Sequence, residues 1–228
     1  MSGGPELRRR KLRSAWSDVI GFVRGGGPPA AGPVLAVAVL AAAPVQAEAR
    51  PPSEGRSPWS LTVYGGPHMD ERFLRIITLR ARGEFTGSYL VALAGAREVG
   101  RIGDGLRFEA EGQLVRHFGH QHHWELNALL VARWASFPWD RQLDTSIAVG
   151  DGLSYATQRP PLERSDDAAD ADDNVRLVNY LMVEIELGRP AEPSWRLVGR
   201  VHHRSPIFGL FGEASGSNFL TLGIRRRF

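Results

Sequence analysis

The sequence has 228 residues, 43 % of them hydrophobic, and it contains no cysteine. This excludes disulfide frameworks, thiolate metal sites and cysteine nucleophiles. Six of the 28 basic residues and three of the 25 acidic residues lie within residues 1–49, so the remainder carries 22 of each sign and no net charge. Such a neutral chain lacks the basic footprint of a nucleic-acid-binding protein, and we expect no nucleic-acid partner.

The first 49 residues have the layout of a secretory signal peptide. A basic cluster, Arg8–Lys11, precedes the apolar run Pro33–Val45, and small residues follow at Ala47 and Ala49. This order predicts export, with cleavage after Ala47 or Ala49, rather than a short membrane anchor. Residues 50–228 then form the mature domain, in which no apolar run approaches the about 20 residues of a membrane-spanning helix.

The mature chain contains eight segments in which apolar and polar residues alternate. In the segment 122–134, for example, Trp124 and Leu126 share one face while His123 and Glu125 share the other. This period of two is typical of β-strands. The predicted strands are 58–65, 86–99, 105–118, 122–134, 141–151, 175–187, 194–203 and 217–228.

The polar face of these strands decides between a soluble and a membrane-spanning barrel. It holds ionisable residues of both signs on strand after strand, which a soluble barrel could not bury in its core. In an inverted barrel the lipid covers the apolar face and the charges pair inside. The predicted lumen network comprises Arg107, Glu109, Glu111, Arg133, Glu184, Glu186, Arg196, Arg200 and Arg225.

The sequence therefore predicts an all-β fold, an eight-stranded antiparallel transmembrane β-barrel in a bacterial outer membrane. Short and long connections alternate, so the long ones are expected outside the cell. A barrel of this size is filled by side chains and forms no pore. The predicted aromatic girdle at the periplasmic side comprises Trp59, Trp134, Trp139 and Trp195.

Two polar residues interrupt the lipid face of the seventh strand near its outer end. Because side chains alternate between the two faces of a strand, the odd-numbered residues of this segment share one face. His203 and Ser205 therefore lie on the same face as Trp195, Leu197 and Val201. Neither polar side chain has a packing reason to face lipid, which leaves a functional site or a solvated strand end. An imidazole two residues from a serine on one face is suited to activating the hydroxyl as a nucleophile.

Several segments carry a resemblance to a known family. They are 122–134, 152–157, 203–205, 207–211, 216–218 and 223–228. In these segments the sequence resembles the outer-membrane lipid A deacylases of the PagL type and their relatives, the acyloxyacyl hydrolases. The resemblance spans residues 58–228. It implies an eight-stranded barrel that removes an ester-linked acyl chain from lipid A with a membrane-facing Ser-His-Glu triad.

The resemblance assigns the general base to His203 and the nucleophile to Ser205. The position of the family's acid holds Asn218, which can orient an imidazole without supplying charge. Asn179 and Glu213 are alternative orienting residues, whereas Asp151 lies two strands away. Pro206 follows the serine and has no N–H for an oxyanion. The implied substrate is lipid A within lipopolysaccharide, and the implied surroundings are outer-membrane lipid.

Two further clusters are interpreted as solvated. The histidines of one outer turn, His117, His120, His122 and His123, are more typical of a solvated tip than of a metal site. The acidic stretch 163–173 is more typical of a solvated loop than of a divalent-ion site. No cofactor and no metal are therefore predicted, and the sequence gives no oligomeric state. The rival function is a non-catalytic barrel that serves membrane integrity or surface contact.

Overall fold

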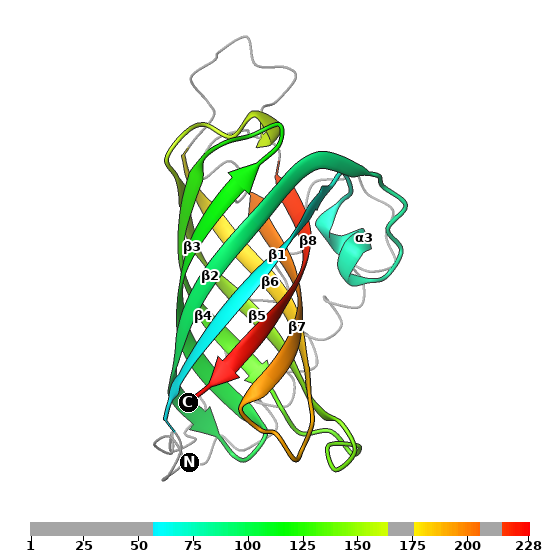
Figure 1. Cartoon of the computed structure of the whole chain (residues 1–228), viewed down its shortest axis with the longest axis vertical. Coiled ribbons are helices and arrows are strands. Elements are labelled where there is room, and N and C mark those ends of the chain that lie inside the picture. The colour runs from blue at the N-terminus through cyan, green and yellow to red at the C-terminus, as the bar shows by residue number, and fades with distance from the viewer. Residues whose placement is uncertain (1–56, 164–175, 206–215) are drawn as a thin grey trace, which may run out of the picture. The chain divides into compact units, whose positions relative to one another are not determined.

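The computed structural model describes residues 57–163, 176–205 and 216–228. These residues form a closed antiparallel barrel in which each strand pairs with the next and β8 returns to β1 (Figure 1). The eight strands are β1 (Trp59–Met69), β2 (Phe85–Ile102), β3 (Leu106–Phe118), β4 (Trp124–Trp134), β5 (Asp144–Ala156), β6 (Leu177–Gly188), β7 (Trp195–Ser205) and β8 (Ser217–Arg227). The predicted fold class is confirmed. The predicted signal peptide, Pro206 and Glu213 lie outside the described residues.

Three strands extend further towards the outer end than the alternation predicts. β1 continues to Met69, β5 to Ala156 and β7 to Ser205. In β1 the Gly65-Gly66-Pro67 sequence is typical of a turn, yet it remains paired with β2. Glycine is required there by close approach, because a Cβ on Gly66 would lie 2.0 Å from the carbonyl oxygen of Leu220. The extension of β7 places Ser205 within a strand rather than in a loop.

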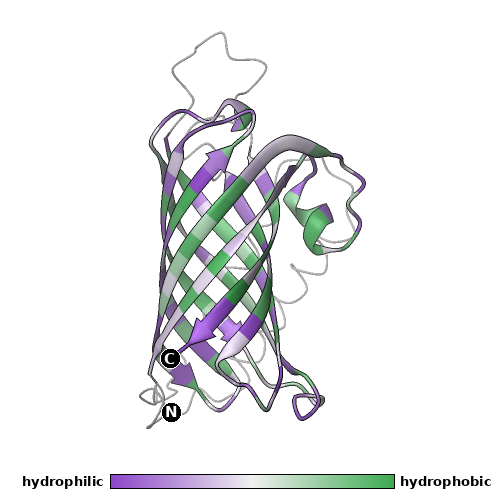
Figure 2. Ribbon diagram, viewed as in Figure 1, coloured by the Kyte–Doolittle hydropathy of each residue, from purple (hydrophilic) through white to green (hydrophobic). Residues whose placement is uncertain are grey.

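The two faces of the barrel differ as the alternation predicts. Leu130 and Leu222 on the outside are each 69 % exposed, whereas Glu184 on the inside is 1 % exposed. Figure 2 shows hydrophobic and hydrophilic residues alternating along the strands. The tryptophans of the predicted girdle are all about half exposed, namely Trp59, Trp134, Trp139 and Trp195.

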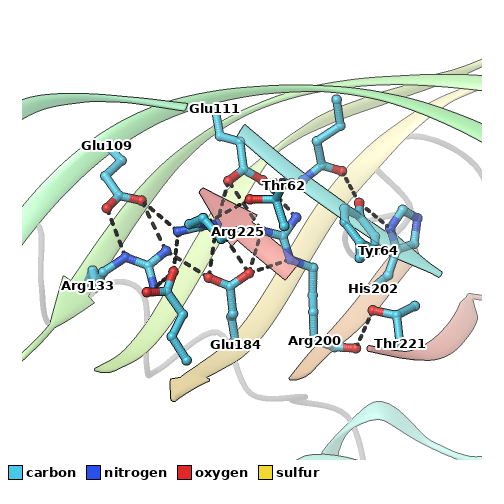
Figure 3. Close-up of polar contacts among 12 residues, drawn as sticks. Thr62, Tyr64, Glu109, Glu111, Arg133, Glu184, Arg200, His202, Thr221 and Arg225 are labelled. Atoms are coloured by element: carbon cyan, nitrogen blue, oxygen red, sulfur yellow. Dashed lines mark hydrogen bonds and ion pairs between the residues drawn. The ribbon is translucent and has the colours of Figure 1, made fainter. Parts of the chain in front are cut away.

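Charged side chains fill the middle of the lumen (Figure 3). Arg133 donates from Nε to Glu109 at 2.9 Å and from Nη2 to Glu184 at 2.8 Å. Arg200 donates from Nε to Glu184 at 2.7 Å and from Nη1 to Glu111 at 2.8 Å. These ion pairs join side chains from different strands, and the side chains fill the lumen. We call the following residues the lumen network: Glu109, Glu111, Arg133, Glu184, Glu186, Arg200 and Arg225.

The connection between β1 and β2 contains a short helix that the alternation does not reveal. Helix α3 (Phe73–Ile77) lies outside the barrel (Figure 1). Its Ile76 packs with Met69 against Val201. Val201 is therefore only 8 % exposed, and the prediction that it faces lipid is wrong, although it lies on the outer face. Among the described residues, no helix is long and apolar enough to span a membrane.

Two predicted solvated clusters are corrected by the structure. In the outer turn, His120 and His122 are exposed as expected, but His117 and His123 are buried in the lumen because their strand parity points them inward. Glu163 ends the 3₁₀ helix η1 (Pro161–Glu163) and is also buried. It accepts a 2.7 Å hydrogen bond from Arg204 Nη1, which compensates its charge. The rest of the acidic stretch lies outside the described residues.

Candidate active site

The predicted site residues on β7 and β8 meet across the strand pair. His203 lies opposite Asn218 in the register of these strands. Its ring nitrogen Nδ1 is 2.7 Å from the Asn218 side-chain oxygen Oδ1. Both side chains are on the outer face of the barrel, near the end at which the long connections lie. The structure therefore joins these two residues, and their catalytic roles stay predictions.

The main chain of the β1–β2 connection fixes which atom of the Asn218 amide faces the histidine. Asn218 Nδ2 donates a 2.7 Å hydrogen bond to the carbonyl oxygen of Glu71. Because a carbonyl oxygen only accepts, the nitrogen of the amide must face Glu71 and its oxygen must face His203. His203 then carries its proton on Nδ1, which leaves the Nε2 lone pair free to act as a base.

Helix α3 covers the histidine from the outside. The ring of Phe73 stacks on the ring of His203, with centroids 4.6 Å apart and planes inclined by 27°. The stack and the Asn218 hydrogen bond restrain the imidazole in different directions, so the ring has one preferred orientation. The site is therefore lodged between the barrel wall and a loop, rather than bare on the lipid face.

Ser205 lies in the same pocket as the His203–Asn218 pair. The pocket measures about 440 Å³ and is lined by Asp70, Glu71, Arg72, Phe73, His203, Ser205, Gly216 and Asn218. A Cβ on Gly216 would lie 3.1 Å from both His203 Cε1 and Ser205 Cβ. The two side chains thus flank the same small space. Within the described residues no hydrogen bond joins His203 to Ser205, as in apo sites whose contacts tighten with substrate.

Glu71 anchors the loop that carries α3. Its two carboxylate oxygens accept main-chain N–H groups, Oε1 from Arg72 and Oε2 from Arg82, each at 2.9 Å. The hydrogen bond from Arg82, followed by that from Arg72, lowers the pKa of Glu71 below its ordinary value of 4.5. Glu71 is therefore ionised at neutral pH and holds the two ends of the loop together.

The alternative orienting residues do not contact His203. Asn179 lies opposite Ser205 in the register of β6 and β7, and its Nδ2 donates to Asp151 Oδ1 and to the Gly152 carbonyl, each at 2.9 Å. Its amide hydrogens are therefore directed towards β5. Glu213 lies outside the described residues.

Strand alternation placed His203 and Ser205 on the outer face, and the family resemblance singled out Asn218, but neither indicated the loop residues around them. Phe73 and Glu71 belong to a connection without alternation, and they reach the site by folding back over β7 and β8. The one sequence signal for this arrangement is the apolar spacing of Phe73, Ile76 and Ile77, which matches one face of a helix.

Comparison with known proteins identifies the fold. No family model and no curated protein matches the sequence. Among solved structures, the outer membrane enzyme PagL matches with a TM-score of 0.50 and 12 % identity, covering 74 % of this chain and 99 % of that chain. Neisserial surface protein A (NspA) matches with a TM-score of 0.45 and 15 % identity over 77 % of this chain and 100 % of its own. The N-terminal β-barrel domain of Pseudomonas aeruginosa OprF matches with a TM-score of 0.43 and 10 % identity over 76 % of this chain and 99 % of its own.

The protein is an eight-stranded antiparallel β-barrel of the bacterial outer-membrane type. This class follows from the closed sheet, the apolar outside and the charged lumen. At 12 % identity, the likeness to PagL concerns the fold alone.

Proposed function

We propose that the protein is an outer-membrane ester hydrolase that removes an ester-linked acyl chain from lipid A. The observation that carries the proposal is the 2.7 Å hydrogen bond between His203 and Asn218, on the outside of the barrel and in one pocket with Ser205. An oriented imidazole beside a serine is a general requirement for nucleophilic acyl transfer. The likeness of fold to PagL, described as an outer membrane enzyme, is compatible with this activity.

The proposed reaction has two steps. First, Ser205 Oγ attacks the ester carbonyl carbon while His203 Nε2 takes the hydroxyl proton. The sugar oxygen then leaves and receives that proton, and the acyl group remains on the serine. In the second step His203 Nε2 takes a proton from water, the resulting hydroxide releases a free fatty acid, and the serine regains its proton.

One cation and two exposed leucines near the pocket suit an acylated substrate with a phosphate group, although Asp70 and Glu71 also line the pocket. The ester bonds of lipid A lie just below its phosphosugar headgroup, at the depth of a strand's outer end. Arg72 lines the pocket. A guanidinium is well suited to binding phosphate oxygens. On the same loop, Leu74 is 52 % exposed and Leu79 is 94 % exposed, which suits contact with acyl chains.

The rival function, a non-catalytic barrel, is favoured by one specific observation. Asn218 stands where a carboxylate would stabilise the imidazolium, and an amide supplies no negative charge. A barrel that had lost its activity would show this replacement. The two functions differ in one measurable respect, which is whether lipid A is altered.

The test is mass spectrometry of lipid A from cells that express the protein, its Ser205→Ala variant or neither. We expect one acyl chain fewer with the unaltered protein and intact lipid A with Ser205→Ala. The variant should remain folded because an outer-face serine has little packing to lose. Ser136→Ala, an exposed serine in the β4–β5 connection, is the matched control and should deacylate normally. Intact lipid A with the unaltered protein would favour the non-catalytic barrel, and deacylation by Ser205→Ala would refute the proposed nucleophile.

A further inference from the structure

The outer end of the lumen contains buried groups that the proposed hydrolase site does not use. His117 at the end of β3 and Glu125 at the start of β4 point inward, as does His123 in the turn between these strands. Their exposed fractions are 1 %, 0 % and 2 %. We call these three residues the lumen histidine cluster. They lie on the inside of the barrel wall, whereas His203 lies on the outside.

The three side chains of the cluster converge. One ring nitrogen from each histidine and one carboxylate oxygen of Glu125 all lie within 4.8 Å of one another. The His117 Nε2 atom is 2.7 Å from Glu125 Oε2. The two imidazole rings are stacked, with centroids 4.3 Å apart and an angle of 14° between their planes.

Three buried polar atoms at the cluster have no hydrogen-bond partner among the described residues. They are His123 Nε2, Gln121 Oε1 and Glu125 Oε1, the last of which forms an ion-pair contact with His202. Leaving such an atom unpaired in a buried site costs about 1–3 kcal/mol. A buried imidazole nitrogen without a partner, in a residue whose neighbours are potential ligands, is therefore suited to binding an ion.

We propose that the lumen histidine cluster binds a divalent transition-metal ion, with Zn²⁺ as the fitting ion. Two imidazole nitrogens and one carboxylate oxygen form a ligand set typical of zinc sites with one open position. Nitrogen ligands disfavour Ca²⁺ and Mg²⁺, which prefer oxygen. Zinc ligands at about 2.0–2.1 Å from the ion lie roughly 3.3 Å apart. Because an imidazole lone pair lies in the plane of its ring, the two stacked rings must tilt out of their stack to share the ion.

The groups behind the ligands are arranged to support binding. Gln121 Nε2 lies 3.0 Å from His117 Nδ1. When His117 binds a metal through Nε2, its proton moves to Nδ1, and a flip of the Gln121 amide brings the unpaired Oε1 into position to accept it. On the other side, His202 Nε2 lies 3.0 Å from Glu125 Oε1 and holds the carboxylate in place. Metal-ligating side chains usually form hydrogen bonds of this kind to neighbouring groups that do not themselves bind the ion.

The charge balance of this part of the lumen leaves room for a cation. At this outer end of the lumen, the buried carboxylates among the described residues are Glu125 and Glu163, and the buried cation is Arg204, which lies 3.7 Å from Glu125 and 2.7 Å from Glu163. With neutral histidines the group carries one net negative charge. A proton on one imidazole would balance this charge too, so a proton is the competitor that the experiment must distinguish.

The experiment measures metal binding by the untagged full-length chain folded in detergent micelles. Equilibrium dialysis against Zn²⁺ should give one bound ion per chain. Co²⁺ in its place should give the visible absorption of a tetrahedral site with nitrogen and oxygen ligands. Because the site joins β3, β4 and their turn, Zn²⁺ should also raise the Tm of the barrel.

Variants identify the ligands. His123→Asn keeps a small polar side chain and should remove the bound ion, and Gln121→Ala should weaken binding about 10- to 100-fold. His122→Ala, in the same turn but exposed, is the matched control and should bind as before. Folding of each variant is checked by heat-modifiable migration on gels. The proposal is overturned if the unaltered chain binds no Zn²⁺, if binding persists unchanged in His123→Asn, or if His122→Ala loses the ion as His123→Asn does.

Discussion

Asn218 orients the His203 ring, whereas a carboxylate at this position would both orient the ring and supply a negative charge. Its amide is bonded at both ends, by His203 at Oδ1 and by the Glu71 carbonyl at Nδ2, each at 2.7 Å. The proposed mechanism therefore rests on the orientation and tautomer of the imidazole alone. A hydrolase of this kind is expected to be slow, because the neutral amide oxygen opposite Nδ1 supplies no negative charge to stabilise the imidazolium.

Removing the Asn218 amide should change the orientation of the His203 ring without changing substrate binding. We expect Asn218→Ala to lower kcat by about 10²-fold, since His203 loses the hydrogen bond that holds its tautomer, while KM changes little. The measurement is steady-state deacylation of purified lipid A in mixed micelles. Leu220→Ala, two residues along the same outer face of β8, is the control and should retain kcat. Equal kcat values for Asn218→Ala and the unaltered protein would remove Asn218 from the site.

Gly216 keeps open the space between the proposed base and nucleophile. Gly216→Ala would place a methyl group 2.8 Å from the Arg204 carbonyl oxygen and 3.1 Å from both His203 Cε1 and Ser205 Cβ. Overpacking of this kind costs about 1–3 kcal/mol, and here it would push the two side chains apart. We expect a folded barrel without deacylation.

The control for Gly216→Ala is Gly95→Ala, because a Cβ on Gly95 meets nothing within 4 Å. Deacylation rates and unfolding midpoints of the two variants are compared. If Gly216→Ala deacylates as fast as Gly95→Ala, His203 and Ser205 do not cooperate across this space.

Individual residues of the site were predictable from the sequence to the extent that strand parity governs them. The alternation of successive side chains between the two faces of a strand indicated His203 and Ser205, whereas Asn218 was assigned from the family resemblance. The same parity placed His123 and Glu125 inside the barrel. The burial of His117 and His123 was nevertheless not predicted. Their turn was interpreted as solvated, whereas their side chains pack inside the outer end of the lumen.

At the scale of elements, the β1–β2 connection determines what surrounds the site. Phe73 covers His203 and Ile76 covers Val201, so a loop replaces lipid over the upper part of β7. This could not be predicted from local pattern, because the helix is only five residues long and is held by contacts with strands distant in sequence. Short helices are rarely stable without such packing.

The Glu71 carboxylate should determine how firmly this loop is held. Its acceptance of N–H groups from Arg72 and Arg82 is lost in Glu71→Gln, which leaves a single oxygen and no charge. We expect faster tryptic cleavage after Arg80 and Arg82 in this variant. Glu84→Gln, an exposed acid of the same connection, is the control and should be cleaved at the original rate. Cleavage at the same rate in both variants would show that Glu71 does not anchor the loop.

The pH dependence of the loop follows from the same carboxylate. Because the N–H groups lower its pKa, the stabilisation is fully present above the ordinary value of 4.5 and is lost as the pH falls through the lowered pKa. Amide hydrogen exchange within residues 71–82, corrected for the intrinsic effect of pH, should therefore increase only in acid below 4.5. In Glu71→Gln this acid-dependent increase should be absent.

For the whole molecule, the alternation of the strands was sufficient to predict the barrel, because only an inverted barrel accommodates charges on the inward faces of so many strands, here β3, β4, β6, β7 and β8. The extents of the strands were less predictable. Gly65, Gly66 and Pro67 are typical of turns, and only the pairing of β1 with its neighbours keeps them in a strand. The lumen network is paired as a unit, since its three arginines (Arg133, Arg200 and Arg225), together with the adjacent Arg227, contact its four glutamates (Glu109, Glu111, Glu184 and Glu186).

These contacts predict which charged side chain contributes most to the free energy of unfolding. Arg133 contacts Glu109, Glu184 and Glu186 at 2.9, 2.8 and 2.8 Å. Without Arg133, the ion-pair partner that Glu109 keeps within the described part of the chain is Arg225, at 3.6 Å. Breaking a buried ion pair from one side costs about 3–5 kcal/mol, because a charge is left uncompensated where water cannot reach it. Arg133→Met, which keeps an unbranched apolar stem but removes the guanidinium, should therefore lower the free energy of unfolding by about this amount.

The matched control for Arg133→Met is Arg97→Met on the outer face, where Arg97 lies over the Trp59 ring at 5.5 Å. Exposed cation–π contacts contribute about 0.5–1 kcal/mol, so the control should be nearly neutral. Urea unfolding in micelles, followed by heat-modifiable gel migration, measures both variants. Because the lumen network and the His203 pocket lie on opposite sides of the wall, Arg133→Met should deacylate normally while it remains folded. Equal unfolding midpoints for the two variants would mean that the lumen charges are solvated, and that the barrel is held by its strand pairing and its outer face instead.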